Sequence, residues 1–596
     1  MSNTEQDLLA SNIVWDLEPL LNGESSPEEL VQKAKVKADQ LSKFKGKVAA
    51  ASVEELVELM TGMAELNDLV GRAGNYVMLK FSADMSDPEI SSLMQKIQEQ
   101  ITEVVSKLLF IEIEFAAADD AHVEKVLADE SLDFCRHYLE QVRNSRPYML
   151  TEDQEFVLVE TSVSGASSWS RLFSELTSEI QVQLGDTSED AVSLDMALSQ
   201  LNSPEAEQRT KVGSAISTAL QETLKTRAFI YNTLLLDKSV DDRLRGFETW
   251  VSSRNLSNEA SDKSVEALIE AVTSRYDIAQ RWYKLKANLL GIEKLKYTDR
   301  YAPLSEGQQE IGWQEGVDIV TDAYESFSPE LAAIAKEFIE KGWIHAPVAP
   351  GKQPGAFCAY TVPSHHPYVL LNWTSKARDV LTLAHELGHG MHAYLARPQG
   401  VFHQSTPLTL AETASVFGET VTNNRLVNLI EDPKEKLALL GGVVDDSIAT
   451  VFRQVAMNRF EHACHSERRD VGELSVDRFG ELWMQSQKDM MGDSVDLDDE
   501  YSTWWSYVPH FIGSPGYVYA YAYGQLLALS VYAQYEQKGE AFVPNYLELL
   551  KSGGSKSPEE LGLMVDCDLS DPGFWAAGLD IVEASLSSAE QAAKDI

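Results

Sequence analysis

One short motif, His385-Glu386-Leu387-Gly388-His389, constrains this 596-residue chain more than any other segment. In an α-helix, residues four apart lie one turn apart on the same face, so both imidazoles can reach one tetrahedral metal ion. Glu386 lies on an adjacent part of the helix, where it can accept a proton from a metal-bound water without being a ligand. The mostly apolar segment Val380–Ala384 before the motif indicates a buried helix, in which unpaired histidines would be costly. The motif therefore predicts a metal site on a helix.

A site of this kind needs a third protein ligand and leaves the fourth position to water. His392 lies two turns from the first histidine and cannot close a tight site with both. The segment Leu410–Glu419 predicts a second helix, and its Glu412 follows His389 at a spacing that allows a loop and a returning helix. Glu419 is expected on roughly the same face, where its carboxylate can hydrogen-bond a ligand imidazole. The spacing thus allows Glu412 as the third ligand.

Most of the chain carries apolar residues at three- and four-residue spacing, as in Ile90–Phe115 and Val265–Leu290. Such spacing is typical of amphipathic helices. A chain of this length also exceeds what one hydrophobic core usually organises. We therefore expect a mainly α protein with an N-terminal helical domain (1–205), a catalytic domain (206–585) and a short C-terminal tail (586–596).

The segment before the motif is the main exception to the helical pattern. Gly355–Val362 and Tyr368–Asn372 are typical of strands, and the turn residues Pro363–Pro367 separate them, which predicts a β-hairpin. Thr374 or Ser375 is then expected to cap the helix that carries the motif. The sequence thus predicts a small hairpin beside the metal-binding helix.

Composition excludes several classes of protein. The net charge of −43 argues against nucleic-acid binding, and it indicates either a strongly hydrated surface or a field that attracts cations. No apolar run reaches membrane-spanning length, and the polar N-terminus shows no secretory signal. The cysteines are scattered and suit a reducing compartment. We therefore expect a cytoplasmic protein with thiols at Cys135, Cys358, Cys464 and Cys567.

A second group of polar side chains follows His510. Tyrosines recur there at every second position, at 517, 519, 521 and 523. Taken alone, this period predicts a strand with one aromatic face, and packing is the simplest role for it.

Together these motifs resemble the thimet-oligopeptidase-like metallopeptidases, and in particular their oligoendopeptidase F branch. The similarity covers about residues 350–525 and rests on Gly351–Phe357, Pro367–Trp373, Thr382–His392, Glu412–Glu419 and the tyrosine-rich run near 510–525. The resemblance implies a large helical shell around a deep substrate channel, with one Zn²⁺ per chain at its floor. It implies His385, His389 and Glu412 as the zinc ligands.

The resemblance also implies the activity, which is internal cleavage of short unstructured peptides with Glu386 as general base. It implies that a histidine and tyrosines of the later run donate hydrogen bonds to the developing oxyanion. We expect this role for His510, Tyr517 and Tyr521. The substrate-binding residues implied are the strand Gly355, Ala356 and Phe357, which would pair with the peptide backbone, and more weakly Tyr519 and Tyr523.

Two alternatives stay open from the residues themselves. A metal carboxypeptidase can use the same motif, but it needs a group that holds the substrate's free C-terminus, and the sequence identifies none. A catalytically silent zinc- or peptide-binding protein would need a fourth protein ligand for a closed structural site, and none is evident. The expected partners are short peptides, without nucleic acid or membrane, and the expected state is a monomer or small homo-oligomer.

Overall fold

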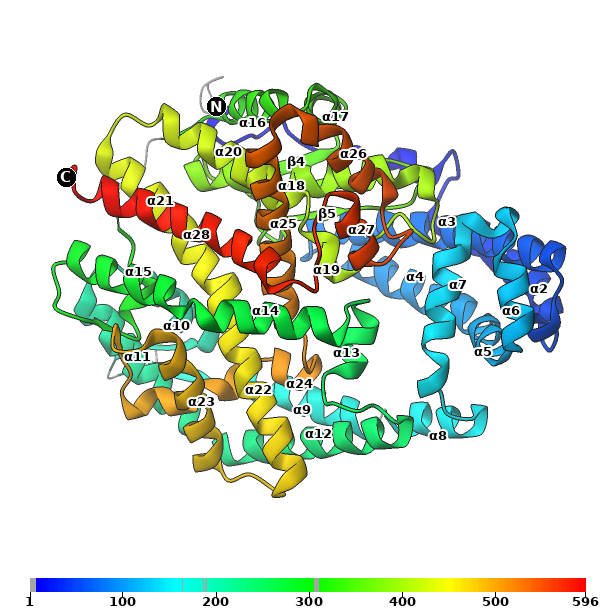
Figure 1. The fold of residues 1–596 in the computed structure, drawn as a ribbon, viewed down its shortest axis with the longest axis horizontal. Helices are drawn as coiled ribbons and strands as arrows, with labels where there is room; N and C mark the ends of the chain where they lie inside the picture. The colour runs from blue at the N-terminus through cyan, green and yellow to red at the C-terminus, as the bar shows by residue number, and fades with distance from the viewer. Residues whose placement is uncertain (1–6, 163, 186, 188–189, 305–309) are drawn as a thin grey trace. The chain divides into compact units, whose positions relative to one another are not determined.

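The computed structural model describes residues 7–162, 164–185, 187, 190–304 and 310–596, and Figure 1 shows their fold. As the periodicity predicts, the chain is mainly α-helical, and its described strands form three small sheets. Across these ranges, no helix combines the length and the apolar character that crossing a bilayer requires. The N-terminal segment in which we expect no secretory signal lies outside the described residues as far as residue 6.

The chain forms two compact units, each assembled from three separate stretches. The first unit contains the described parts of residues 1–146, 309–429 and 531–568, and the second contains those of 147–308, 430–530 and 569–596. The expected domains 1–205 and 206–585 and the tail 586–596 stay predictions. One helix, α28 (Pro572–Ala592), continues past the expected start of the tail.

Helices of the first unit form because they bury apolar stripes. In α3, for example, Leu66, Val70, Ala73 and Val77 recur every three or four positions and are buried, and Ser52 caps the helix start. The helices are α2 (Pro27–Leu41), α3 (Val53–Ala83), α4 (Pro88–Ser106), α5 (Phe110–Ala117), α6 (Asp120–Leu127), α7 (Arg136–Asn144), α16 (Trp313–Phe327), α17 (Pro329–Glu340), α18 (Ala377–Ala396), α19 (Leu408–Ala411), α20 (Ser415–Leu429), α26 (Val543–Ser552) and α27 (Pro558–Met564).

The second unit is built in the same way. Its helices are α8 (Glu152–Ser162), α9 (Ala166–Ser178), α10 (Leu194–Ser199), α11 (Ala206–Gln221), α12 (Leu224–Arg245), α13 (Ser252–Ser257), α14 (Asp262–Ser274), α15 (Tyr276–Leu289), α21 (Pro433–Ser447), α22 (Arg453–Asp470), α23 (Val476–Met491), α24 (His510–Gly513) and α28. Helix α25 (Tyr519–Lys538) contributes residues to both units. The two periodic stretches near 100 and 280 are helical as predicted, each as a pair of helices.

The predicted β-hairpin is present in the first unit. Strands β5 (Phe357–Ala359) and β6 (Tyr368–Trp373) pair antiparallel, with Phe357 opposite Leu370 and Ala359 opposite Tyr368. A further strand that the sequence did not indicate, β4 (Ile344–Pro347), pairs parallel with the other side of β6. Helix α18 packs against both β5 and β6. The second unit has two sheets of two strands each, β1 (Gln181–Gln183) with β2 (Ala191–Ser193) and β3 (Leu295–Lys296) with β7 (Val495–Asp496).

Tyr519, Tyr521 and Tyr523 lie in the first turns of α25, and Tyr517 lies just before it, so the prediction of a strand there is wrong. A spacing of two residues also places every second tyrosine four positions apart, which is one helical turn. Tyr517 and Tyr521 therefore share one side of this segment, and Tyr519 and Tyr523 share another. The alanines between them favour a helix, and a single sequence pattern could not separate the two periods.

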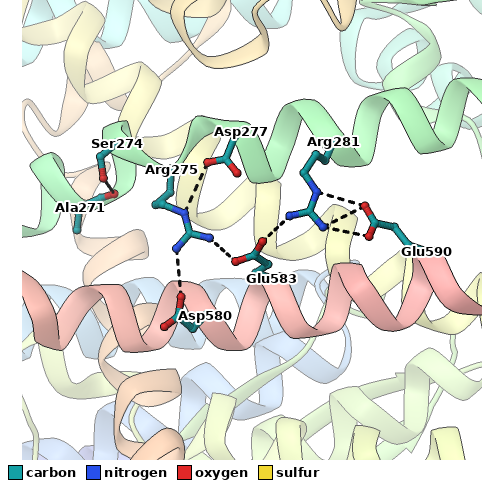
Figure 2. A network of polar contacts seen from close by, with 8 residues as sticks. All are labelled: Ala271, Ser274, Arg275, Asp277, Arg281, Asp580, Glu583 and Glu590. Atoms are coloured by element: carbon teal, nitrogen blue, oxygen red, sulfur yellow. Dashed lines mark hydrogen bonds and ion pairs between the residues drawn. The ribbon is translucent and has the colours of Figure 1, made fainter.

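An ion-pair network attaches α28 to the α14–α15 region of the second unit, as Figure 2 shows. Arg275 pairs with Asp580 at 3.1 Å and with Glu583. Arg281 also pairs with Glu583, and it contacts Glu590 at 3.0 Å. Because one carboxylate joins two guanidinium groups, the pairs act as a network rather than as isolated surface contacts.

The network predicts a pH-dependent effect of Arg281→Gln. We expect a loss of stability of at most about 1 kcal/mol at pH 7 and low salt, since the groups are partly exposed and solvent screens them. The hydrogen bond from Arg281 is the main cause that lowers the pKa of Glu583 from its ordinary value of 4.5. A lowered carboxyl pKa contributes stability above the ordinary value, and this contribution disappears as the pH falls through the folded pKa.

Thermal unfolding of Arg281→Gln and wild type should therefore differ at pH 7 and converge once the pH falls below the lowered pKa of Glu583. Arg171→Gln is the matched control, because Arg171 forms an exposed pair with Glu175 on one helix of the same unit. An equal effect of both substitutions would show that the network contributes nothing beyond a surface pair.

Candidate metal centre

Helix α18 carries the motif and is packed between several elements of the first unit. It packs against α16, α17, α20 and α26 as well as the small sheet. Its first turn is closed by Asp379, whose carboxylate accepts the backbone N–H groups of Thr374 (2.7 Å) and Lys376 (3.1 Å). The start of the helix is thus capped by the carboxylate of Asp379, which bonds to preceding backbone N–H groups. The hydroxyl of Thr374 or Ser375, which we expected in this role, does not provide the cap.

Gly388, inside the motif, allows Glu412 to approach the two histidines. A Cβ atom at Gly388 would lie 2.5 Å from the carbonyl oxygen of Ala414 and 2.6 Å from the Cα of Ser415. The backbone that follows Glu412 therefore passes directly against α18. This close approach of two main chains is the local reason why Glu412 reaches the histidines.

The structure brings His385, His389 and Glu412 together. One ligand atom from each lies within 4.8 Å of the others. The Oε2 of Glu412 is 3.4 Å from Nε2 of His385 and 3.5 Å from Nε2 of His389. The hydroxyl of Ser415 donates a hydrogen bond of 2.6 Å to the same Oε2. Two imidazole nitrogens and one carboxylate oxygen thus converge on one point, with all three side chains half-buried.

Glu419 fixes the orientation of the His385 imidazole through the ring nitrogen that faces away from Glu412. Its Oε2 lies 3.0 Å from Nδ1 of His385, so Nδ1 donates to the carboxylate and Nε2 keeps its lone pair for a metal. Burial lowers the pKa of His385, but the bond to Glu419 and the charge of Glu412 outweigh it and raise this pKa to about 9. Burial lowers the pKa of His389 to about 4. Glu419 thus contacts His385, although it lies on α20 while Glu412 lies in the turn before this helix, and not on one helix with it as predicted.

Glu386 differs from His385, His389 and Glu412 in its hydrogen bonding. It is buried, and its Oε2 has no hydrogen-bond partner among the residues that the structure describes. Burial, aided by the charge of Glu412, raises the pKa of Glu386 to about 7. A carboxyl group with this pKa can both accept and release a proton near neutral pH.

These observations fit a divalent metal ion. The donor set is two imidazoles and a carboxylate, which suits zinc, and His385 also contacts the carboxylate of Glu419, as metal-binding histidines commonly do. The unpartnered Oε2 of Glu386 is a further buried polar atom beside these donors. His392 is buried and lies outside the cluster.

The hydrogen bond between Glu419 and His385 predicts the effect of Glu419→Gln. The amide can no longer hold Nδ1–H of His385 through a charged acceptor, so we expect metal affinity to fall about 10- to 100-fold. Competition with a chromogenic chelator would measure this change. Glu315→Gln, which removes the same charge from an exposed position on α16 of this unit, is the control. Equal metal affinities of the Glu419→Gln and Glu315→Gln variants would show that Glu419 does not support metal binding.

The segment that we expect to bind substrate, Gly355–Phe357, lies beside the candidate metal site. Gly355 is exposed, and Ala356 and Phe357 are half-buried. In the sheet of described strands, β5 pairs only with β6 and leaves its other edge free. The sequence did not indicate Tyr360, although it directly follows β5 and its ring centre lies 6.5 Å from that of His389.

The sequence also gave no signal for Lys352, which fixes the loop before β5. This side chain is buried, and its ammonium group donates to the carbonyl oxygens of Pro347 at 2.7 Å and Leu371 at 2.5 Å. It thereby joins β4 to β6. Burial lowers the pKa of Lys352 to about 8.

His510, Tyr517 and Tyr521 lie together in the second unit. Nε2 of His510 is 3.2 Å from the hydroxyl oxygen of Tyr521. The ring of Tyr517 stacks on His510 with centroids 5.9 Å apart, and it meets the ring of Tyr521 edge-on at 5.1 Å. All three are half-buried. They form one cluster of hydrogen-bond donors.

Tyr519 and Tyr523 occupy a different environment. Both are fully buried. The hydroxyl of Tyr519 donates to Asn255 at 2.6 Å, and that of Tyr523 to Ser264 at 3.3 Å. These contacts inside the second unit give both tyrosines a packing role, in contrast to the substrate contact expected for them.

Comparison with known proteins agrees with the resemblance seen in the motifs. A family model described as Oligopeptidase F matches residues 114–181. The chain is 25% identical over 589 residues to oligopeptidase PepF of Bacillus subtilis, covering 97% of this chain and 87% of that protein.

Two solved structures share the fold. A crystal structure from Chlamydophila abortus is 22% identical with a TM-score of 0.86 over 98% of both chains. Oligoendopeptidase-F from Enterococcus faecium is 20% identical with a TM-score of 0.71, over 96% of this chain and 99% of that one. The model of Peptidase family M3 matches residues 199–580, more than half of the sequence, and the chain therefore belongs to this family of peptidases.

Proposed function

We propose that this chain is a zinc-dependent endopeptidase that hydrolyses internal bonds of short, unstructured peptides. The observation that carries the proposal is the convergence of His385, His389 and Glu412 beside the buried, unpartnered carboxyl of Glu386. The name of the Bacillus relative, an oligopeptidase, supports the substrate class. The free edge of β5 supports internal cleavage, because a strand edge binds an extended peptide through its main chain without needing a chain end.

Zinc is the proposed metal because two imidazoles and a carboxylate, with one position left for water, are the ligands of catalytic zinc sites. When bound, it lowers the pKa of a water molecule and polarises the scissile carbonyl. His385, His389 and Glu412 would hold it, and Glu419 would keep His385 in the tautomer that binds.

The chain's own residues perform the remaining steps of the proposal. The peptide backbone pairs with the edge of β5, which begins at Phe357, and contacts Gly355 and Ala356 just before the strand. Glu386 accepts the proton of the attacking water and delivers it to the leaving amine, a role that suits a buried carboxyl whose Oε2 has no hydrogen-bond partner among the described residues. The donor cluster of His510, Tyr517 and Tyr521 stabilises the oxyanion. A helical channel that admits short peptides would exclude folded proteins.

The test is hydrolysis of an internally quenched peptide of about ten residues with both termini blocked. We expect internal cleavage that stops when a chelator removes the metal and returns when zinc is added. Product masses would locate the cleaved bond. Trimming of a free-ended peptide without cleavage of the blocked one would instead identify a carboxypeptidase. Full activity in the chelated, metal-free protein would refute the metal mechanism.

A further inference from the structure

A tight turn lies between His510 and Tyr517 in the second unit. The N–H of Tyr517 donates to the carbonyl oxygen of Ser514 at 3.1 Å, which closes a four-residue turn. Pro515 occupies its second position, and Gly516, with φ of +72°, occupies its third. This is the pattern of a type II turn, in which proline suits the second position and the third needs a positive φ. A type I turn differs from it by a flip of the peptide group between these two residues.

That peptide group is held at both ends by side chains from distant helices. The N–H of Gly516 donates to Oε1 of Glu461, on α22, at 3.0 Å. The carbonyl oxygen of Pro515 accepts from Nε of Arg254, on α13, at 3.3 Å. A flip of the peptide would break both hydrogen bonds at once. We propose that Glu461 and Arg254 are positioning residues that lock this turn and thereby place Tyr517 against His510.

The surroundings of Glu461 support a specific role. Its side chain is fully buried, and its second oxygen, Oε2, has no hydrogen-bond partner in the part of the chain that the structure describes. A carboxyl group in such a place is unfavourable unless it is hydrogen-bonded, and the bond to Gly516 is the one that satisfies it. Burial also raises the pKa of Glu461 to about 8, so the group is largely neutral at pH 7 and a neutral acceptor there suffices.

The turn connects directly to the donor cluster. The guanidinium carbon of Arg254 lies 5.9 Å from the centre of the Tyr517 ring, so Arg254 contacts both the turn and the tyrosine that follows it. The carbonyl oxygen of Tyr517 accepts the N–H of Ala520 and thus leads into α25. A displaced Tyr517 would leave the stacking position on His510. Because a misplacement of about 1 Å can cost a hundredfold in rate, the turn controls turnover without touching substrate.

This inference rests on the proposed function only for its kinetic part, and Glu461→Met tests it. Methionine fills the space but cannot accept the Gly516 bond. We expect kcat to fall about 10- to 100-fold with KM changed less than about threefold. The thermal midpoint should change little, because removal of an unfavourable buried carboxyl offsets the loss of the hydrogen bond to the buried Gly516 N–H. Glu461→Gln keeps a neutral acceptor and should restore kcat to within about threefold of wild type.

Tyr517→Phe completes a double-mutant cycle. If Glu461 acts through Tyr517, adding Glu461→Met to Tyr517→Phe should lower kcat little further. Independent, multiplying effects would overturn the inference. An unchanged kcat in Tyr517→Phe alone would instead refute the oxyanion role in the proposed function.

Amide hydrogen exchange tests the turn without any activity. We expect the segment 514–517 to exchange at least tenfold faster in Glu461→Met and in Arg254→Met, but not in Glu461→Gln. This result would hold even if the protein cleaved no peptide. Unchanged exchange in both methionine variants would show that the two side chains do not hold the turn.

Discussion

Replacing Glu386 with glutamine should lower kcat by about two to four orders of magnitude. The amide cannot accept the proton of the attacking water, and no described hydrogen bond of Oε2 is lost by the change. Glutamine also has nearly the same shape, so the buried site should keep its packing. Because Glu386 is outside the ligand cluster, the bound metal should stay at one ion per chain.

The measurement combines steady-state cleavage of the blocked peptide with metal analysis of the same sample. Glu315→Gln, at an exposed position of α16, controls for loss of a negative charge. If the kcat of Glu386→Gln lay within tenfold of the wild-type value, Glu386 would not be the general base. A variant that had lost its metal would give Glu386 a role in metal binding instead.

Gly388→Ala should damage the metal site through the backbone. The added methyl would lie 2.5 Å from the Ala414 carbonyl oxygen, and a main chain cannot rotate away as a side chain does. We expect a loss of stability of roughly 1–3 kcal/mol from overpacking. The segment bearing Glu412 must also move outward, so metal affinity should fall at least tenfold.

Gly442→Ala is the matched control for this substitution. Gly442 lies within α21, and no heavy atom would come within 4 Å of a Cβ atom there. Alanine favours a helix over glycine by about 1 kcal/mol, so this variant should be at least as stable as wild type. Thermal unfolding and chelator competition on both variants check the prediction. Equal metal affinity in Gly388→Ala and wild type would contradict the role given to Gly388.

The convergence of His385, His389 and Glu412 was predictable because the sequence patterns that carry it are local. His385, Glu386 and His389 lie within one helical turn or so, and the hairpin before them has its own turn residues. Glu412 lies in the turn between α19 and α20, and Glu419 lies on α20, so the single helix predicted over Leu410–Glu419 is interrupted at 412–414. Both carboxylates still needed only a short return of the chain. Periodicity within such segments determines local secondary structure, and this local structure positions the side chains of the site.

Contacts between distant segments were not predictable from the same patterns. Strand β4 joins β6 in parallel, and Lys352 joins both, but no alternation or spacing marks either contact. Tyr519 shows a different limit. Its period of two fits a strand as well as one face of a helix, and only the buried partner Asn255 decides between a packing role and a substrate contact.

The interleaved construction of the two units has a consequence for synthesis on the ribosome. Chains made of consecutive domains can fold them one after another as they emerge. Here the first unit needs residues 531–568, whose helix α26 packs on α18, and the second needs α28, which packs on α14 and α21. Neither unit can close while its last stretch is still inside the ribosome. The nascent chain therefore exposes apolar helix faces until residues 531–596 have emerged, and it should depend on chaperones throughout that period.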